Sequence, residues 1–177
     1  KSHEALLQLN RFSDLLRMVL RNAEADWISL GEELKQLQLY IELEAERFTE
    51  RFVWGINVTD DLDEDFDRLP PMILQPFVEN AIWHGLLPKD GFRKLNISLR
   101  KEGGFLCCKI EDNGVGRAWH TGKNRSDHFS IGVSVTRKRL ALINGHEQQA
   151  GRIDIHDLTD AEGKPAGTRV CIYIPLK

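Results

Sequence analysis

The first 50 residues show the apolar period of two amphipathic helices. In the first, apolar positions recur at steps of three and four, which places them on one stripe of a helix; they are Leu9, Phe12, Leu16 and Val19. The polar stretch 22–26 interrupts this pattern, and Ser29 followed by Glu32 forms a capping box that predicts a second helix. The apolar stripe of the second helix consists of Leu34, Leu37, Ile41, Ala45 and Phe48. Such a hairpin buries little surface alone, so we expect it to pack against the following domain or a second copy of itself.

From Arg51 onward, apolar positions alternate with the period of a β-strand in several short segments. The predicted strands are residues 52–58, 95–99, 105–110, 152–156 and 168–174, and helices are predicted at 72–83 and 133–143. Pro70 and Pro71 precede the first of these helices, as is common at a helix start. The order of the elements is typical of a sheet with helices on one face. We therefore expect an α+β fold: an α-helical hairpin, residues 1–50, followed by a two-layer α/β sandwich, residues 51–177.

Composition and charge narrow the class of protein. Of 177 residues, 41% are apolar and 29% charged, as in ordinary soluble globular proteins. No apolar run approaches the ~20 residues that a membrane helix needs, and the first residues do not form a signal peptide. The net charge of -3 and the lack of a basic run argue against a nucleic-acid-binding surface. The three cysteines, Cys107, Cys108 and Cys171, lie in apolar runs without ligand-like spacing and are expected to be reduced core residues.

A carboxylate and two glycines follow the predicted strand 105–110. In the run 112–116, Asp112 precedes Gly114 and Gly116, and glycines let the backbone approach a ligand closely. Asp112 could accept a hydrogen bond from an exocyclic amine such as that of adenine. The same residues are also an ordinary turn signal, so the local pattern leaves both interpretations open.

Polar residues on the predicted helix 72–83 form a second candidate. The apolar residues of this helix supply a core face, so Glu79 and Asn80 could point into a cleft. The amide oxygen of Asn80 is a suitable ligand for Mg²⁺, which prefers oxygen. His84 follows at the end of the helix, where the helix dipole alone already favours a histidine.

Two later segments could also contact a nucleotide. Gly132 lies in the segment 130–133, which is predicted to open a helix after the polar loop 113–130. Free N–H groups and the dipole at a helix start favour phosphate. Thr168, after Gly167, enters the last strand, where its hydroxyl could bond a carboxylate or water beside adenine. Each of these features is weak alone, but their order along helix, strand end, loop and strand is more specific.

Together the motifs resemble the Bergerat-fold (GHKL) ATPases and kinases, and within them the autolysin-sensor (LytS/YehU-like) histidine kinases. The segment 69–85, LPPMILQPFVENAIWHG, is very similar to the N box of that family, and 40–48 to its preceding helix. Residues 112–116 match the first glycine box. Gly132 with Arg139-Leu140 matches the second, and Gly167-Thr168 with Ile174-Pro175 matches the terminal strand. The resemblance covers essentially the whole chain.

The resemblance implies a protein-histidine kinase that transfers the γ-phosphate of ATP to a histidine upstream of this segment. Asn80 would hold Mg²⁺ against the triphosphate, and Glu79 would share the catalytic position. The nucleotide-binding residues would be Asp112 at the adenine amine, Gly114 and Gly116 along the nucleotide, Gly132 at the phosphate lid, Thr168 at the adenine end, and His84. The implied partners are a response regulator and a second copy in the full-length protein, with no nucleic acid.

The resemblance also implies a place in the cell. We expect the chain to be a segment of a longer membrane receptor, attached to the membrane only through an N-terminal part and lying on the cytoplasmic side. The family's phosphoacceptor motif, His-Phe-Leu-Phe-Asn, does not occur in this sequence. His3 and His128 lack the neighbouring residues of a phosphoacceptor, so we expect the chain not to phosphorylate itself.

Departures from the family pattern keep two other functions open. Ser130 and Val133 stand where the family usually has Gly and Leu, and Trp83 stands where it often has Lys. These differences are compatible with a non-catalytic nucleotide-binding or dimerisation module of a degenerate kinase. An ATP hydrolase of the same fold would carry a water-activating Glu four residues before Asn80, but this chain has Pro76 there.

Overall fold

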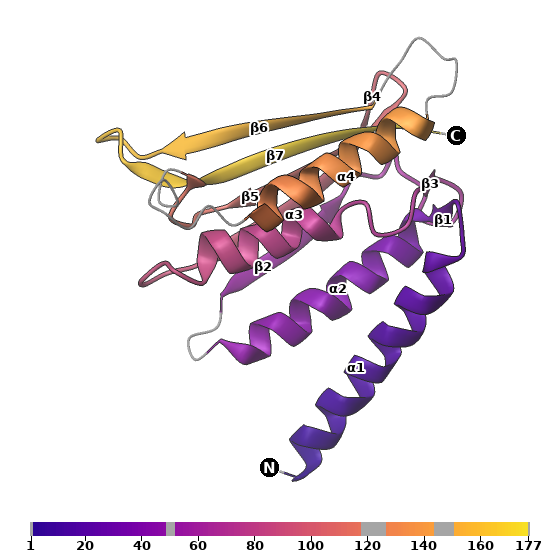
Figure 1. Ribbon diagram of the computed structural model, residues 1–177, viewed down its shortest axis with the longest axis horizontal. Coiled ribbons are helices and arrows are strands. Elements are labelled where there is room, and N and C mark those ends of the chain that lie inside the picture. The colour runs from indigo at the N-terminus through magenta and orange to yellow at the C-terminus, as the bar shows by residue number, and fades with distance from the viewer. Residues whose placement is uncertain (1, 49–51, 118–126, 144–150, 177) are drawn as a thin grey trace. The chain divides into compact units, whose positions relative to one another are not determined.

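The computed structural model describes residues 2–48, 52–117, 127–143 and 151–176 (Figure 1). These residues belong to two compact units. The first unit combines Lys1–Arg51 with Asp63–Gln75, and the second combines Phe52–Leu62 with Pro76–Leu176. None of the helices in the described ranges is long and apolar enough to cross a membrane.

The first unit contains the predicted helical hairpin, formed by α1 (Ser2–Ala23) and α2 (Leu30–Arg47). The predicted capping box is present at the start of α2: Ser29 Oγ accepts the Glu32 N–H at 3.2 Å, and the Glu32 carboxylate accepts the Ser29 N–H at 3.2 Å. Two short strands, β1 (Ile28–Ser29) and β3 (Arg68–Leu69), pair antiparallel beside the hairpin.

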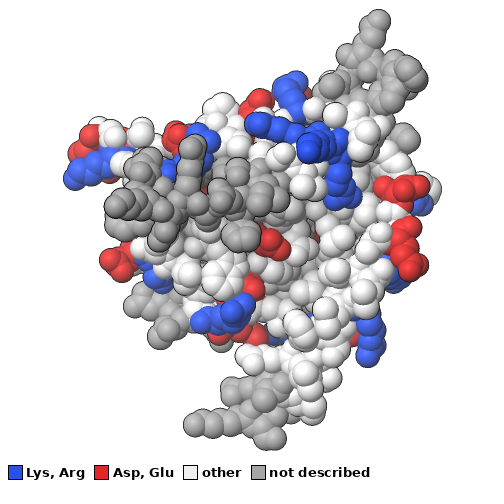
Figure 2. Space-filling model, viewed as in Figure 1, with Lys and Arg blue, Asp and Glu red and all other residues white. Residues whose placement is uncertain are grey.

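The apolar stripe predicted on α1 lies mostly on the surface. Leu9, Phe12 and Leu16 are 60%, 51% and 45% exposed, whereas Leu15 and Asn22 of the same helix are buried. The part of Figure 2 that corresponds to α1 is largely made of uncharged side chains. The helix itself is therefore as predicted, but among the described residues one apolar face of α1 stays exposed.

A buried carboxylate in the first unit holds the segment that precedes α3 (Gln75–Asn80). Glu33, only 1% exposed, accepts the Met72 N–H at 2.7 Å and the Leu74 N–H at 3.1 Å. Met72 has a φ of 54°, in the left-handed region that residues other than glycine rarely adopt. Charge-assisted hydrogen bonds are stronger than neutral ones, so the clamp stabilises a backbone conformation that costs about 1–3 kcal/mol.

A chain of three amides lies beside this clamp. Asn22 donates to Gln36 at 2.9 Å, and Gln36 donates to Gln75 at 3.2 Å. Asn22 and Gln36 are buried, so their hydrogen bonds satisfy polar groups that would otherwise be costly to bury. α1, α2 and the first residue of α3 are thereby joined by polar contacts inside one unit.

The second unit contains a five-stranded sheet in the order β2-β4-β5-β7-β6. The strands are β2 (Val53–Val58), β4 (Lys94–Glu102), β5 (Phe105–Asp112), β6 (Arg152–Thr159) and β7 (Pro165–Pro175). β2 pairs parallel to β4, and the other pairs are antiparallel. Buried apolar residues alternate along the central strands, and helical residues of this unit cover that face (Figure 1). The predicted two-layer sandwich is confirmed.

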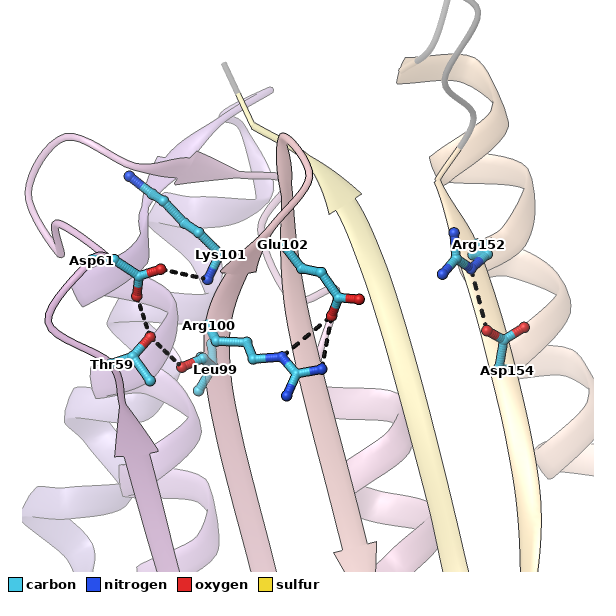
Figure 3. A network of polar contacts seen from close by, with 8 residues as sticks. All are labelled: Thr59, Asp61, Leu99, Arg100, Lys101, Glu102, Arg152 and Asp154. Atoms are coloured by element: carbon cyan, nitrogen blue, oxygen red, sulfur yellow. Dashed lines mark hydrogen bonds and ion pairs between the residues drawn. The ribbon is translucent and has the colours of Figure 1, made fainter.

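The other face of the sheet is polar (Figure 3). Arg100 pairs with Glu102 on β4 at 2.8 Å, and Arg152 pairs with Asp154 on β6 at 3.3 Å. At the end of β2, the Thr59 hydroxyl bonds the Leu99 carbonyl at 3.2 Å. No second apolar layer is needed on this side, because its side chains form hydrogen bonds and ion pairs at the surface.

The three cysteines are free. Cys107 and Cys108 are buried as predicted, and Cys171 is only half-buried.

Two predicted helix starts were wrong. The helix expected at 72–83 begins at Gln75, because Met72 adopts a left-handed conformation, and it continues as the π-helical segment η1 (Ala81–Leu86). The helix expected at 133–143 is α4 (Asp127–Ile143), so Gly132 lies inside a helix and not at its start. Val133, Thr136 and Leu140 are buried at steps of three and four, a stripe that favours the helix despite the glycine. Residues 118–126 of the predicted loop 113–130 lie outside the described residues.

The Glu33 clamp predicts a large effect on stability. Glu33→Ala would leave the backbone N–H groups of Met72 and Leu74 without their acceptor, and an unpaired buried donor costs about 1–3 kcal/mol. We expect the free energy of unfolding, measured by urea denaturation, to fall by about 3 kcal/mol. Glu24→Ala, at an exposed position directly after the end of α1, is the matched control. Equal small changes in both variants would contradict the clamp.

Candidate active site

The helix that carries three candidate residues ends in a π-helical segment. α3 contains Glu79 and Asn80, and η1 contains His84. The Leu87 N–H bonds the Ile82 carbonyl at 2.8 Å, a hydrogen bond across five residues. π-helical turns are rare and often occur at functional sites, because they change the direction of the side chains that follow.

A pocket of about 280 Å³ lies beside this helix. It is lined by Pro76, Glu79, Asn80, Trp83, His84 and Gly132. The structure therefore brings together four residues that the sequence predicted as site residues: Glu79, Asn80, His84 and Gly132. Gly132 approaches from α4, where a Cβ would lie 3.4 Å from the Pro76 ring. Its role cannot be that of a helix N-terminus, as was expected, and a Cβ at this position would make only an ordinary van der Waals contact with Pro76.

The donors in this pocket suit a metal ion that arrives with a phosphate. Asn80 offers an amide oxygen and Glu79 a carboxylate. Among the described residues, no group of three or more His, Cys, Asp or Glu could hold a metal ion. Mg²⁺ is usually bound by one or two side-chain oxygens together with substrate phosphates and waters, so the residues present fit it in that form.

Asp112 ends strand β5 and is buried. Its side chain is 4% exposed, and the Gly114 N–H donates to Oδ1 at 2.8 Å. Burial raises the pKa of Asp112 from its ordinary value of 3.8 to about 6, since the charged form loses hydration, and the N–H groups of Gly114 and Thr168 offset part of this. Thr168 lies opposite Asp112 in the β5–β7 ladder and is 8% exposed. Asp112 is thus a buried acceptor and does not line the pocket.

Three glycines lie close to Asp112 or to the backbone that packs against it. A Cβ at Gly85 would lie 2.7 Å from Asp112 Oδ1, and a Cβ at Gly114 would lie 2.3 Å from the Gly85 carbonyl. Gly167 has a φ of 128°, and a Cβ there would lie 2.0 Å from the Asp112 carbonyl oxygen. Real Cβ contacts are essentially never shorter than 3.0 Å. The backbones of η1, the turn after β5 and β7 therefore meet at Asp112 only because all three residues are glycine.

Gly116, the second predicted glycine of this turn, has a φ of 74°. A Cβ there would lie 3.2 Å from Pro165 at the start of β7. The left-handed conformation and the close approach both favour glycine.

Sequence reasoning gave no role to Gly85 or Lys89. Gly85 follows His84 directly within the segment that resembles the N box, and this position in the motif is the one sequence feature that could have indicated a role for Gly85. The Lys89 ammonium donates to the Asn113 carbonyl at 2.6 Å, and the Asn113 amide accepts the Lys94 N–H at 2.7 Å. These contacts fix the loop after η1 against the turn after β5. They depend on the folded path of residues 87–93, so no local pattern could reveal them.

Comparison with known proteins agrees with the predicted resemblance. A family model described as "Histidine kinase" matches residues 1–52. Sensor protein LytS of Staphylococcus epidermidis is 26% identical over 177 residues, covering 100% of this chain and 29% of the relative. LytS of Oceanobacillus iheyensis is 35% identical over 159 residues, covering 84% of this chain and 26% of the relative. Sensor histidine kinase YesM of Bacillus subtilis is 27% identical over 173 residues, covering 96% and 28%. The chain thus spans less than a third of the length of these relatives.

Solved structures share the fold. The histidine kinase domain of the blue-light activated histidine kinase from Erythrobacter litoralis superposes with a TM-score of 0.60 at 16% identity, over 96% of this chain and 75% of that chain. The catalytic domain of histidine kinase ThkA superposes with a TM-score of 0.54 at 15% identity, over 84% of this chain and 94% of that chain. The expected Bergerat fold is confirmed.

The raised pKa of Asp112 predicts a pH-dependent stability. A raised folded-state pKa means that the folded protein binds the proton more tightly, so Asp112 contributes stability below about pH 3.8 that is lost as the pH rises through about 6. Relative to Asp112→Asn, the wild type should therefore lose about 3 kcal/mol between these limits, from about 1.4 kcal/mol per pKa unit. Thermal unfolding of both proteins at several pH values measures this difference.

Asp61 provides the control. The Thr59 hydroxyl lowers the pKa of the exposed Asp61 carboxyl, so Asp61→Asn should show a small difference of the opposite sign. A wild-type and Asp112→Asn pair whose stabilities run parallel from pH 4 to pH 7 would contradict the buried carboxylate.

Proposed function

We propose that this chain, a member of the sensor histidine kinases of the autolysin-sensor type, is the part that binds Mg-ATP and donates its γ-phosphate to a histidine outside the chain. The observation that carries the proposal is the gathering of Glu79, Asn80, His84 and Gly132 around one pocket. The next residue of the same helix, Gly85, contacts the buried carboxylate of Asp112. One helix would thus provide residues that contact the phosphates of the nucleotide and a residue that packs against the acceptor of its purine.

The chain's own groups bind and position the nucleotide. Asp112 accepts a hydrogen bond from the adenine amine, with its Oδ1 already held by the Gly114 N–H. Gly114 and Gly116 form the wall along the nucleotide, and Thr168 supports the adenine end from β7. Such contacts accelerate phosphoryl transfer mainly by positioning, because the protein takes no covalent part in it.

The pocket serves the triphosphate. The Asn80 amide oxygen, with Glu79 beside it, would hold Mg²⁺, and the ion when bound neutralises charge on the phosphates. His84 lines the same pocket and can donate to a phosphate oxygen. Pro76 has no ionisable group to activate water, which favours transfer over hydrolysis.

The remaining roles are inferred from the similarity of this chain to sensor histidine kinases. Residues 1–50 would belong to the dimerisation and phosphoacceptor region, and residues 51–177 would be the ATP-binding domain. The exposed apolar face of α1, with Leu9, Phe12 and Leu16, supports a homodimer of the full-length protein. The phosphoryl group would pass to a response regulator, and the chain would act on the cytoplasmic side of a membrane receptor.

A second candidate function is a nucleotide-binding module without kinase activity. Trp83 lines the pocket and is 38% exposed, at a position where the family often has a lysine that could contact phosphate. ATP binding without transfer to any histidine of the full-length protein would favour this function.

Asn80 should matter mainly when Mg²⁺ is present. Because its amide oxygen would bind the ion and not the nucleotide, Asn80→Ala should weaken Mg-ATP binding by about tenfold, or 1.4 kcal/mol, and metal-free ATP binding much less. Calorimetric titrations with Mg²⁺ and with a chelator give both affinities. Asn57→Ala, on the exposed edge of β2, is the control. Equal losses with and without Mg²⁺ would mean that Asn80 does not bind the ion.

The chain should bind ATP without labelling itself. Phosphoryl transfer requires an acceptor within near-attack distance, and the histidines of this sequence lack the acceptor motif. Incubation with γ-labelled ATP and Mg²⁺, on material whose ATP binding has been measured, should give no acid-labile label. Label that disappears in His3→Ala would show that His3 is the acceptor and would overturn the family assignment.

A further inference from the structure

Gly85 covers one face of the Asp112 carboxylate with bare backbone. A Cβ at this position would lie 2.7 Å from Oδ1, 3.0 Å from Cγ and 3.4 Å from Oδ2. The added methyl group would therefore clash with Oδ1 and press on Cγ, while Oδ2 would remain in ordinary van der Waals contact. Either the helix or the carboxylate would have to move.

The helix is held in place at this point. The Val115 N–H donates to the Gly85 carbonyl at 3.0 Å, and Gly114 packs directly on the same peptide. The next carbonyl, of Leu86, accepts from Arg93 Nε at 2.9 Å and from the Lys89 N–H at 3.1 Å. Carbonyls at the end of a helix have no partner within the helix, so these bonds are the ones that satisfy them. Lifting η1 would break several of them together.

The carboxylate is the more easily displaced partner. A rotation about its side-chain bonds would relieve the contact with a methyl group at residue 85, at the expense of the bond from the Gly114 N–H to Oδ1. The two oxygens of Asp112 would then be oriented differently toward a ligand bound at this carboxylate. The orientation of this acceptor depends on the absence of a side chain at residue 85.

We propose that Gly85 is a specificity-determining residue of the nucleotide site, which keeps Asp112 in the orientation that accepts the 6-amino group of adenine. The inference rests on the proposed function, since it assumes that Asp112 binds the purine. It adds that a side chain at residue 85 removes the preference for a 6-amino over a 6-oxo purine. Binding of the triphosphate in the pocket around Asn80 and His84 is retained.

The test compares ATP with inosine triphosphate, which carries an oxygen in place of the 6-amino group. Calorimetric titration with Mg²⁺ should show that the wild type prefers ATP by about 10- to 100-fold, the effect expected of one hydrogen bond to a charged group. In Gly85→Ala the two affinities should become nearly equal, with that for inosine triphosphate changed by less than about threefold. A Gly85→Ala variant that keeps the wild-type preference overturns the inference.

Two further proteins separate the inference from the function on which it rests. Gly55→Ala, on β2 with no atom within 4 Å of the added Cβ, is the matched control and should keep the preference. Asp112→Asn should lose it. A wild type that does not prefer ATP overturns both the function of Asp112 and the role of Gly85. Preference that is lost in Asp112→Asn and kept in Gly85→Ala overturns only the role of Gly85.

A double variant covers the case in which Gly85→Ala folds poorly. Asp112→Ala removes the atoms that the added methyl group would meet. Gly85→Ala should therefore lower the melting temperature much less in the Asp112→Ala background than in the wild type. An equal decrease in melting temperature in both backgrounds would mean that the added methyl group clashes with atoms other than the Asp112 carboxylate, and it would overturn the inference.

Discussion

The contact between the backbone of η1 and the end of β5 determines the geometry of the site. Gly85 lies against the Asp112 carboxylate, Gly114 against the backbone of Gly85, and Gly167 against the backbone carbonyl of Asp112, each at a distance that no side chain would permit. With η1 fixed there by the Val115 N–H, His84 of η1 and Asn80, which directly precedes η1, have a defined place at the pocket. The position of the Asp112 carboxylate and the position of the pocket residues are thus consequences of one packing constraint.

The start of the same helix is fixed by a different interaction. Glu33 holds Met72 in a left-handed conformation through two backbone hydrogen bonds, and the amide of Gln36 bonds Gln75. α3 begins at Gln75 in the first unit and continues through residues of the second. Within the second unit, the close glycine packing at Gly85 leaves η1 little freedom to rotate, which is what a site that works by positioning requires.

Much of this arrangement could be predicted from the sequence, and the exceptions have physical causes. The alternation of apolar and polar positions predicted the strands, and the spacing of Ser29 and Glu32 predicted the capping box, because both patterns depend only on residues close together in the sequence. Glu33 belongs to an amphipathic helix, where an acidic residue normally meets solvent, and only the fold brings backbone donors to it. The hydrogen bond from the Val115 N–H to the Gly85 carbonyl likewise joins residues far apart in the sequence, so no local pattern indicates it. The sequence placed Gly132 at a helix start because a polar loop was predicted before it, but the helix begins earlier, and the buried stripe around Val133 outweighs the helix propensity of about 1 kcal/mol that a glycine loses.

The role proposed for the buried carboxylate would also link nucleotide binding to folding. At neutral pH the charged Asp112 costs about 3 kcal/mol relative to an exposed aspartate, since its pKa is raised to about 6. The donors within the chain, chiefly the Gly114 N–H, offset only part of the lost hydration. A hydrogen bond from an adenine amine would favour the charged form and lower that pKa. A ligand that binds only the folded state stabilises it, so nucleotide binding would offset the cost of burying the group that recognises it.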